Sequence, residues 1–370
     1  MEKFDSKIEI IDTIENARRC ALDRDLTIST EKPTYAPEKF DFERNISIAN
    51  LKKYFESRDF KIAEPIPLKM EGATTLFVSA GIQILEGVIH KEEELPDVPI
   101  FINQPVLRSQ FLGSSAIESH TSFINLATLD IDVNMEKHFD HLKDWISYLI
   151  LSGFKKEDFL IQIKEDSPKI GDIEYKNIVA KVFYGGLEVG DAVFVPSLPQ
   201  KTRHHFSISD IGFGLERLNH NPETTNIVEI DCLKTLALLC LSGVEPSNNN
   251  HGYRFRMFSK RLVSECELDY LKLTKILEAT SGFIEYWTQL GVSTSIDADK
   301  ATDLVVKECN RNFNREILNL LRKEHDYQKE IDINQTTVNF VSQLERIGDK
   351  TKDFWDLIKT KLTINQNWTL

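Results

Sequence analysis

The spacing of apolar residues along the chain changes near residue 230. Before that point, short runs rich in Val, Ile and Phe recur between turn-forming residues, which is the pattern of β-strands. These runs are Thr75–Ser79, Ile100–Ile102, Phe159–Ile163, Ile178–Tyr184, Ala192–Val195 and Phe206–Ile208. Segments with helical spacing lie between them, at Ser47–Arg58, Met135–Ser152 and Gly214–Asn219.

After residue 230 the apolar residues recur at intervals of three and four, which predicts helices almost throughout. The segments are Leu233–Leu241, Leu268–Gly291, Ala298–Lys323 and Thr336–Ile347, with a loop at Pro246 and Asn248–Asn250. We therefore expect an α+β domain over residues 46–230 and an all-α domain over residues 231–370. The charged first 45 residues are predicted to be an N-terminal extension, ordered only in part.

Composition narrows the function classes. The chain has 370 residues and a net charge of −13, so bulk attraction to nucleic acid or to an anionic membrane is not expected. Its five cysteines are far apart and form no CxxC pair, which indicates neither a disulfide framework nor a structural zinc site. The first residues lack the apolar core of a signal peptide, and the apolar run Leu236–Leu241 is too short to span a bilayer. We expect a soluble, cytoplasmic protein with no membrane partner.

The nonapeptide Asp210–Leu218 (DIGFGLERL) combines an acid, two glycines and an arginine. Gly212 and Gly214 carry no Cβ, so the backbone there can approach a ligand closely. Arg217 can grip a phosphate with its planar fork. Asp210 can hold a cationic group such as the ammonium of an amino acid. The segment therefore predicts a nucleotide and an amine bound side by side.

Two further groups of residues fit a nucleotide site, and each has a structural alternative. Arg108 ends a strand-like segment and precedes Phe123, so the arginine can contact an α-phosphate and the ring can stack on a purine. The alternative is a surface arginine and a core phenylalanine. Glu188 and Asp191 flank a glycine on a predicted strand, where they can hold Mg²⁺ beside phosphates or simply face water.

In their order along the chain, these segments resemble the alanyl-tRNA synthetase family. The matching segments are Tyr54–Gly81, Gln104–Arg108, His120–Phe123, Leu187–Phe194, Asp210–Leu218 and Gly243–Tyr253. The most specific are Asp210–Leu218, which is similar to the third class II motif D-T-G-x-G-L-E-R, and Gly243–Tyr253, which is similar to G-x-x-P-S-N-x-x-R-G-Y. The resemblance spans roughly residues 45 to 345. It implies a class II synthetase-type antiparallel sheet flanked by helices, followed by a helical tRNA-recognition domain.

The resemblance also implies a reaction, in which ATP and an amino acid form an aminoacyl-adenylate that passes to tRNA or another acceptor. Arg108 would contact the α-phosphate and Arg217 the γ-phosphate. Phe123 would stack on adenine, and Glu188 would lie at the ATP or Mg²⁺ end. Asp210 would pair with the substrate ammonium. Arg254, Arg256, Lys260 and Arg261, a +4 patch, would contact tRNA, although a solvated basic helix face is the alternative.

The sequence departs from the family at several positions. Ser119 and Ile124 replace an arginine and an acid that the family carries near the adenine site. Gly190 and Asp191 replace Trp and Asn in a strand that, with Val193, borders the amino-acid pocket. Losing an indole predicts added space, and gaining a carboxylate predicts a hydroxylated or cationic amino acid rather than alanine. The family's G-P-C-G-P-C-S-E segment and its editing-domain metal motifs have no counterpart here.

These departures leave three hypotheses open. The chain is an amino-acid-activating ligase, possible as a homodimer, or an inactive paralogue that binds tRNA or an amino acid, or a partner subunit of a synthetase. Two histidine pairs bear on metal binding. His138 and His141 are interpreted as a surface pair rather than a metal site, and His204 and His205 as part of a solvated loop.

Overall fold

The chain forms two compact units. The computed structural model describes residues 6–44, 46–70, 75–87, 96–111, 120–167, 169–170, 173–174, 176–198, 206–224, 226–292, 296–325 and 330–347. Unit 1 comprises Met1–Val106 and Phe123–Thr224, and unit 2 comprises Leu107–Ser122 and Thr225–Leu370. Each unit has its own buried core.

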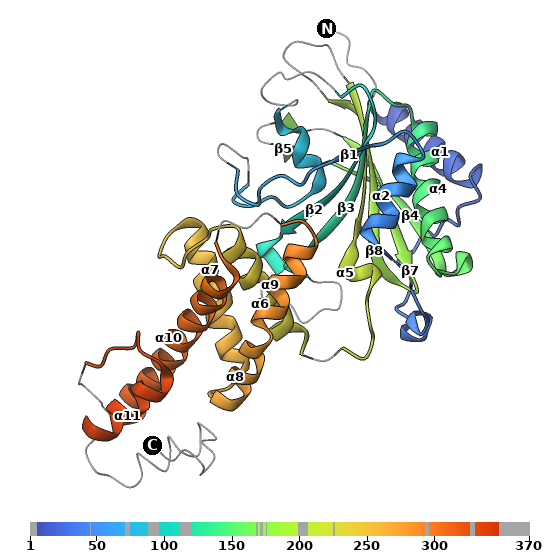
Figure 1. Cartoon of the computed structure of the whole chain (residues 1–370). Coiled ribbons are helices and arrows are strands. Elements are labelled where there is room, and N and C mark those ends of the chain that lie inside the picture. Colours follow the sequence, from blue (N-terminus) through green and yellow to red (C-terminus); the bar gives the residue numbers. More distant parts are fainter. Residues whose placement is uncertain are drawn as a thin grey trace. The chain divides into compact units, whose positions relative to one another are not determined.

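Unit 1 is built on a seven-stranded sheet (Figure 1) with the strand order β1-β2-β3-β9-β8-β7-β4. The strands are β1 (Lys61–Ala63), β2 (Ile100–Leu107), β3 (Ser122–Ile131), β4 (Phe159–Asp166), β7 (Asn177–Tyr184), β8 (Leu187–Leu198) and β9 (Phe206–Gly214). The pairs from β3 through β9, β8 and β7 to β4 are antiparallel, whereas β1 and β2 are parallel. The predicted antiparallel sheet is therefore a mixed one. Strands β5 (Lys169–Ile170) and β6 (Ile173–Glu174) form a separate pair.

Helix α4 (Met135–Leu151) covers one face of this sheet. Asn134 begins the helix, because its side chain accepts a hydrogen bond from the Lys137 backbone N–H at 2.9 Å. Trp145 is fully buried; its Nε1 donates to Thr128 Oγ1 at 2.8 Å, and its ring lies 4.8 Å from that of Phe213. The aromatic contacts tie α4 to strands β3 and β9. Unit 1 also contains helix α2 (Ile48–Glu56) and the four-residue α5 (Leu215–Leu218).

The N-terminal segment packs on unit 1 rather than forming a loose arm. Helix α1 (Ser6–Leu22) buries Ala17, Cys20 and Ala21. After it, the backbone pairs with β4, where Ser29 donates to the Ile161 carbonyl at 2.8 Å. The expectation of a partly ordered arm is corrected for residues 13–44, where buried apolar side chains and backbone hydrogen bonds hold the segment on unit 1. Short 3₁₀ helices lie at Pro37–Phe40, Gly81–Leu85, Ser109–Phe111 and Lys156–Asp158.

One local prediction from apolar spacing is wrong, and the helical segment predicted at Leu268–Gly291 is confirmed but divided. Thr75–Ser79 forms no strand, because local hydrogen bonds bend it: Thr75 Oγ1 donates to the Phe77 carbonyl at 2.7 Å. Leu268–Gly291 contains two helices instead of one, α8 (Tyr270–Glu278) and α9 (Thr280–Gln289). The two helices meet at Ala279, beside the hydrogen bond from Thr280 Oγ1 to the Leu277 carbonyl.

Unit 2 is helical, with α6 (Ile227–Leu241) at its centre. Every residue of α6 from Asp231 to Leu241 is buried, as expected for a helix that is apolar on nearly all sides. Around it lie α7 (Asn250–Glu265), α8, α9, α10 (Ala298–His325) and α11 (Thr337–Ile347). Figure 1 colours these helices from yellow to red. The mixed sheet with flanking helices, followed by this helical region, confirms the predicted α+β class and is consistent with a class II synthetase-type fold.

The cysteines belong to the cores of the two units. Cys20 is buried in unit 1, and Cys232, Cys240, Cys266 and Cys309 are buried in unit 2. Burial raises the pKa of Cys240 to about 12 and that of Cys266 to about 11, so both thiols stay protonated near neutral pH. Within the described ranges, no cluster of three His, Cys, Asp or Glu side chains is arranged to hold a metal ion. None of the described helices is long and apolar enough to cross a membrane.

His138 and His141 are buried, which corrects their interpretation as a surface pair. They lie on the side of α4 that faces the sheet, where His138 Nδ1 is 2.7 Å from Ser209 Oγ and His141 Nε2 is 2.8 Å from Asp130 Oδ2. Burial, together with the neighbouring His141, lowers the pKa of His138 to about 3. His138 is therefore neutral in the folded protein and belongs to the core.

The buried His138 should make the stability of unit 1 depend on pH. In the unfolded chain its pKa returns to about 6.5, so between pH 6.5 and 3 the unfolded state binds more protons than the folded state. The free energy of unfolding should therefore fall as the pH falls through this window, by up to ~1.4 kcal/mol per pH unit from this group. Urea titrations at pH 7, 6 and 5 should show a shallower dependence in His138→Gln than in the natural chain. Equal slopes in the two proteins would contradict the assignment.

Candidate active site on the sheet of unit 1

The candidate site residues of strands β8 and β9 lie on the face of the sheet opposite α4. In the register of the sheet, Asp191 stands opposite Gly212 on one side and Lys181 on the other. Two residues along, Val193 stands opposite Asp210. Directly opposed residues in an antiparallel pair point to the same face, and residues two apart on a strand do so too. Asp191, Val193, Asp210 and Gly212 therefore share one face, whereas Gly190, also predicted to border the pocket, alternates to the other face opposite Phe213. A role of these residues in amino-acid binding stays a prediction.

Arg217 and Glu188 join this face through Lys181. Lys181 Nζ lies 2.6 Å from Glu188 Oε2, and Arg217 Nη1 lies 3.9 Å from Glu188 Oε1. Arg217 Nη1 also donates to the Glu188 backbone carbonyl at 3.1 Å. The three side chains are each 19 to 25% exposed, so a ligand can reach them. Lys181 was not singled out in the sequence, because an isolated lysine on a strand gives no signal without the register.

Helix α5, which carries Arg217, is held at both ends. At its start, Glu216 Oε2 accepts a hydrogen bond from the Ile124 backbone N–H at 3.0 Å. At its end, Arg44 Nη1 donates to the carbonyls of Leu218 and His220 at 3.1 and 2.6 Å. A cation at the C-terminal carbonyls of a helix is favourable. The N-terminal segment therefore helps to position Arg217 of the nonapeptide.

Asn125 links the candidate pocket to the segment before β2. Asn125 Oδ1 accepts the Gly81 backbone N–H at 2.7 Å, and a Cβ built on Gly81 would lie 2.7 Å from Ala127 Cβ. A Cβ built on Gly212 would lie 2.8 Å from Asn125 Nδ2. Both glycines are therefore needed for close packing around this amide. Asn125 was missed in the sequence, since its partners lie far away along the chain.

Gly190 does not open space in the pocket. A Cβ at this position would lie 2.5 Å from the Gly212 carbonyl oxygen and 2.6 Å from the Phe213 ring. Phe213, which stands opposite Gly190 in the register, fills the place. The expectation of added volume from the loss of an indole is therefore wrong, and the proposed selectivity has to rest on Asp191.

The residues near the predicted adenine site are packed in the core. Phe123 is 8% exposed and packs with Val78 and Val106 in an apolar cluster, as the core alternative predicts, while the side chain of Ile124 is fully buried. The predicted stacking of Phe123 on adenine stays a prediction. Arg108 belongs to unit 2, where its backbone N–H donates to the Thr121 carbonyl at 2.7 Å; its phosphate role also stays a prediction. Ser119, His204 and His205 lie outside the described residues.

Among the predicted tRNA contacts on α7, the four cations do not form one patch. Arg254 and Arg261 are two turns apart and share one side of the helix, whereas Arg256 and Lys260 share another. Arg261 Nη2 pairs with Glu265 at 2.7 Å, and Arg256 Nε lies 3.6 Å from Glu308 Oε1. The predicted continuous +4 patch is thus divided and partly neutralised. The role of these residues toward tRNA stays a prediction.

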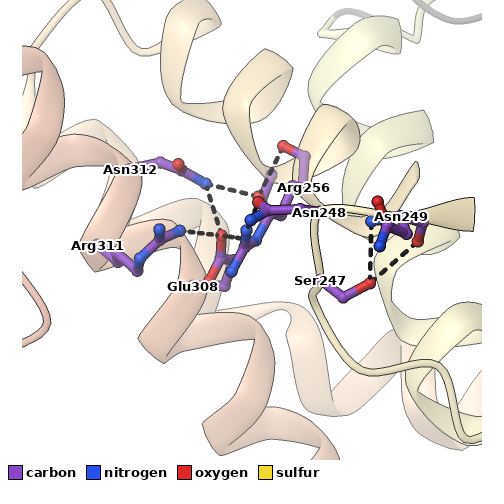
Figure 2. A network of polar contacts seen from close by, with 8 residues as sticks. Ser247, Asn248, Asn249, Arg256, Glu308, Arg311 and Asn312 are labelled. Atoms are coloured by element: carbon purple, nitrogen blue, oxygen red, sulfur yellow. Dashed lines mark hydrogen bonds and ion pairs between the residues drawn. The ribbon is translucent and has the colours of Figure 1, made fainter. Parts of the chain in front are cut away.

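The structure gives a reason for the P-S-N…G-Y signature. A Cβ on Gly252 would lie 2.3 Å from Ser247 Oγ and 2.4 Å from the Glu245 carbonyl oxygen. Ser247 Oγ in turn donates to the Asn249 carbonyl at 3.0 Å (Figure 2). The first turn of α7 therefore packs directly on the loop before it, and only glycine fits at this contact.

Comparison with known proteins places few limits on this site. No protein-family model matches the chain, and no curated protein matches it. Among solved structures, the chain is similar to PylSc, a pyrrolysyl tRNA synthetase of Desulfitobacterium hafniense. The two share 16% identity over 49% of this chain and 67% of that chain, with a TM-score of 0.33. A likeness of this size assigns neither a family nor a substrate to the chain.

Proposed function

We propose that unit 1 binds ATP and an amino acid and joins them as an aminoacyl-adenylate, in the manner of alanyl-tRNA synthetases. The supporting observation is the single sheet face that carries Asp210 and Asp191 together with the Lys181–Glu188–Arg217 chain of contacts. An acid for an ammonium group and cations for phosphates on one face are what this reaction needs. Transfer of the product to tRNA or to another acceptor is part of the proposal.

The proposed chemistry needs no dedicated base. An oxygen of the substrate carboxylate, already ionised at neutral pH, attacks the α-phosphorus of ATP. A new oxygen–phosphorus bond forms, and the bond to the bridging oxygen breaks, so pyrophosphate leaves with the electron pair. Arg217 stabilises negative charge on the phosphates. Asp210 holds the ammonium group and thereby orients the attacking carboxylate.

The resemblance implies Mg²⁺, but the described residues provide few carboxylates that could bind it. Glu188, the assigned ligand, is already engaged by Lys181 at 2.6 Å and by Arg217 at 3.9 Å. No cluster of three candidate ligands lies among the described residues. Mg²⁺ is commonly held by one or two carboxylates together with substrate phosphates. Glu188 as a metal ligand stays a prediction, and no step of the proposed reaction is assigned to the metal.

The substrate is proposed to be a hydroxylated or cationic amino acid. Asp191 supplies a carboxylate that a hydroxyl or ammonium group can meet on this face of the sheet. Lys181 stands opposite Asp191 in the register. A cation at this register position favours a hydroxyl donor over a second cation, because like charges close together repel.

Pyrophosphate exchange tests the proposed activity directly. Radiolabelled pyrophosphate should enter ATP when the protein is given Mg²⁺, ATP and at least one amino acid from a complete panel. Asp210→Asn should raise the KM for that amino acid by about thirtyfold, because the loss of a charge-assisted contact costs ~2 kcal/mol. A normal KM in Asp210→Asn would exclude the ammonium role of Asp210.

A second candidate function is an inactive paralogue that binds tRNA or an amino acid. The observation in its favour is the packing of Phe123 and Ile124 in the core, where the family's adenine contacts would be expected. No exchange with any amino acid, together with measurable tRNA binding, would favour this function over the ligase. Binding only to a partner synthetase would indicate a structural subunit.

A further inference from the structure

Residues 34–44, blue in Figure 1, contact two segments that carry candidate site residues. One is the turn between β7 and β8, which ends just before Glu188, and the other is the end of α5, directly after Arg217. We call residues 34–44 the strap. The strap and both segments belong to unit 1. The strap therefore touches the chain on either side of the contact between Glu188 and Arg217.

At the turn, the strap packs backbone against backbone. The Ala36 backbone N–H donates to the Gly185 carbonyl at 2.8 Å. A Cβ built on Gly186 would overlap the Thr34 carbonyl oxygen. Gly185 and Gly186 have φ angles of 50° and 78°, in the region that glycine adopts without steric cost. The two glycines therefore permit a close contact, and this contact fixes the turn that leads into Glu188.

At the end of α5, the strap binds through Arg44. Its Nη1 donates to the carbonyls of Leu218 and His220 at 3.1 and 2.6 Å, and its Nη2 donates to the Phe40 carbonyl at 2.7 Å. Tyr35 adds a second contact, because its hydroxyl lies 2.7 Å from His220 Nε2. One guanidinium thus joins the backbone of the strap to the last carbonyls of the helix.

Helix α5 depends on such contacts for its position. It has four residues, about one turn, and a helix this short is not stable by itself. Arg217 Nη1 donates to the Glu188 carbonyl at 3.1 Å, so a shift of either segment would break this contact. A guanidinium binds phosphate oxygens through a planar fork, whose alignment is lost when the helix rotates or moves.

We propose that Arg44 is a positioning residue for Arg217, and that the strap keeps Arg217 and Glu188 in register by holding the segments that carry them. The inference rests on the proposed function in taking Arg217 as the phosphate-binding cation. Arg44 acts through the carbonyls of α5 and contacts no substrate. Its positive charge is also favourable at the C-terminal end of a helix.

Pyrophosphate exchange by Arg44→Gln, Arg44→Lys and Arg58→Gln tests the positioning role. Arg44→Gln should lower kcat/KM for ATP by about tenfold to a hundredfold, mainly through KM, because misplacing a binding group by about 1 Å has effects of this size. The KM for the amino acid should stay unchanged. Arg44→Lys keeps a donor for the α5 carbonyls and should recover part of the loss. Arg58, which also lies over an aromatic ring, 3.6 Å from the centre of Tyr54, is the matched control and should exchange at the natural rate.

The KM for ATP separates positioning from a general loss of stability. A smaller folded fraction lowers the apparent kcat and leaves both KM values unchanged. In an Arg217→Ala background, Arg44→Gln should cost less than about twofold further, because the two residues act through one contact. Fully additive losses, or a natural KM for ATP in folded Arg44→Gln, would overturn the proposal. If melting curves show that Arg44→Gln does not fold, Tyr35→Phe replaces it, with an expected rise in KM of about threefold.

Amide hydrogen exchange in the substrate-free chain gives a readout that does not depend on activity. Peptides covering residues 185–189 and 215–221 should exchange about tenfold faster in Arg44→Gln than in the natural chain, whereas α4 should be unchanged. Unchanged exchange at 215–221 would overturn the positioning role even in a chain that activates an amino acid. Failure of the natural chain to exchange pyrophosphate would instead overturn the proposed function, and faster amide exchange in Arg44→Gln would still support the contact of the strap with α5.

Discussion

Replacing Arg217 by alanine is expected to lower kcat/KM for ATP–pyrophosphate exchange by about a hundredfold to a thousandfold. Arg217 is the cation assigned to the γ-phosphate, and removing one preformed donor to developing charge has effects of this size in other enzymes. The Arg217 side chain is 19% exposed, and its Nη1 donates to the backbone carbonyl of Glu188. The guanidinium is therefore fixed on the sheet face before ATP binds. Initial exchange rates at varied ATP concentration measure the effect.

Two variants show whether the loss of exchange activity in Arg217→Ala results from a lost phosphate contact. Arg217→Lys keeps the charge without the planar fork and should retain part of the activity. Arg58→Ala removes another arginine of unit 1 that forms an ion pair, with Asp144 at 3.0 Å, away from the candidate site. It should exchange pyrophosphate at the natural rate. An Arg217→Ala protein that melts like the natural chain and keeps its full activity would exclude the assigned role.

The helices and the central strands could be predicted because their signals are local. Apolar spacing placed α4, α10 and α11 within one or two residues of their observed bounds, whereas α6 begins six residues before the predicted Leu233. The predicted strand Phe206–Ile208 is the first part of β9, and the predicted helical segment Gly214–Asn219 contains α5, which begins at Leu215. A pattern of period two or 3.6 is set by neighbours along the chain, so a single sequence contains it.

The errors arise where a residue's partner lies far away along the chain. His138 and His141 were expected on the surface of a helix, but both are buried. Their rings form hydrogen bonds with Ser209 and Asp130 on the sheet. Gly190 looked like a vacated site, because the ring that fills it belongs to the next strand in the sheet. Local spacing carries no information on such contacts, and the register of the sheet supplies it.

Selectivity of the proposed site consequently depends on charge more than on volume. The pocket gains no space at Gly190, so a larger substrate side chain would have to extend along the face that carries Asp191 and Val193. Lys181 and Glu188 border that face and form their own ion pair. A substrate hydroxyl could donate to Asp191 without adding charge to this arrangement.

Gly190→Ala is expected to destabilise unit 1 by about 2 to 3 kcal/mol, although alanine is favoured over glycine in a strand. The new methyl group would meet the Gly212 carbonyl oxygen at 2.5 Å and the Phe213 ring at 2.6 Å, and the carbonyl is part of the sheet backbone. Urea denaturation measures the change. Gly282→Ala is the matched control: a Cβ there meets nothing within 4 Å on helix α9, so this variant should gain about 0.5 to 1 kcal/mol.

Phe213→Leu in the Gly190→Ala background separates the two contacts. A smaller side chain relieves the clash with the ring and leaves the clash with the Gly212 carbonyl, so the double variant should recover only part of the lost stability. The coupling between the two substitutions should be about 1 kcal/mol and favourable, because the residues are direct partners across β8 and β9. Strictly additive effects, or a Gly190→Ala protein as stable as the natural chain, would show that the place beside Gly190 is open.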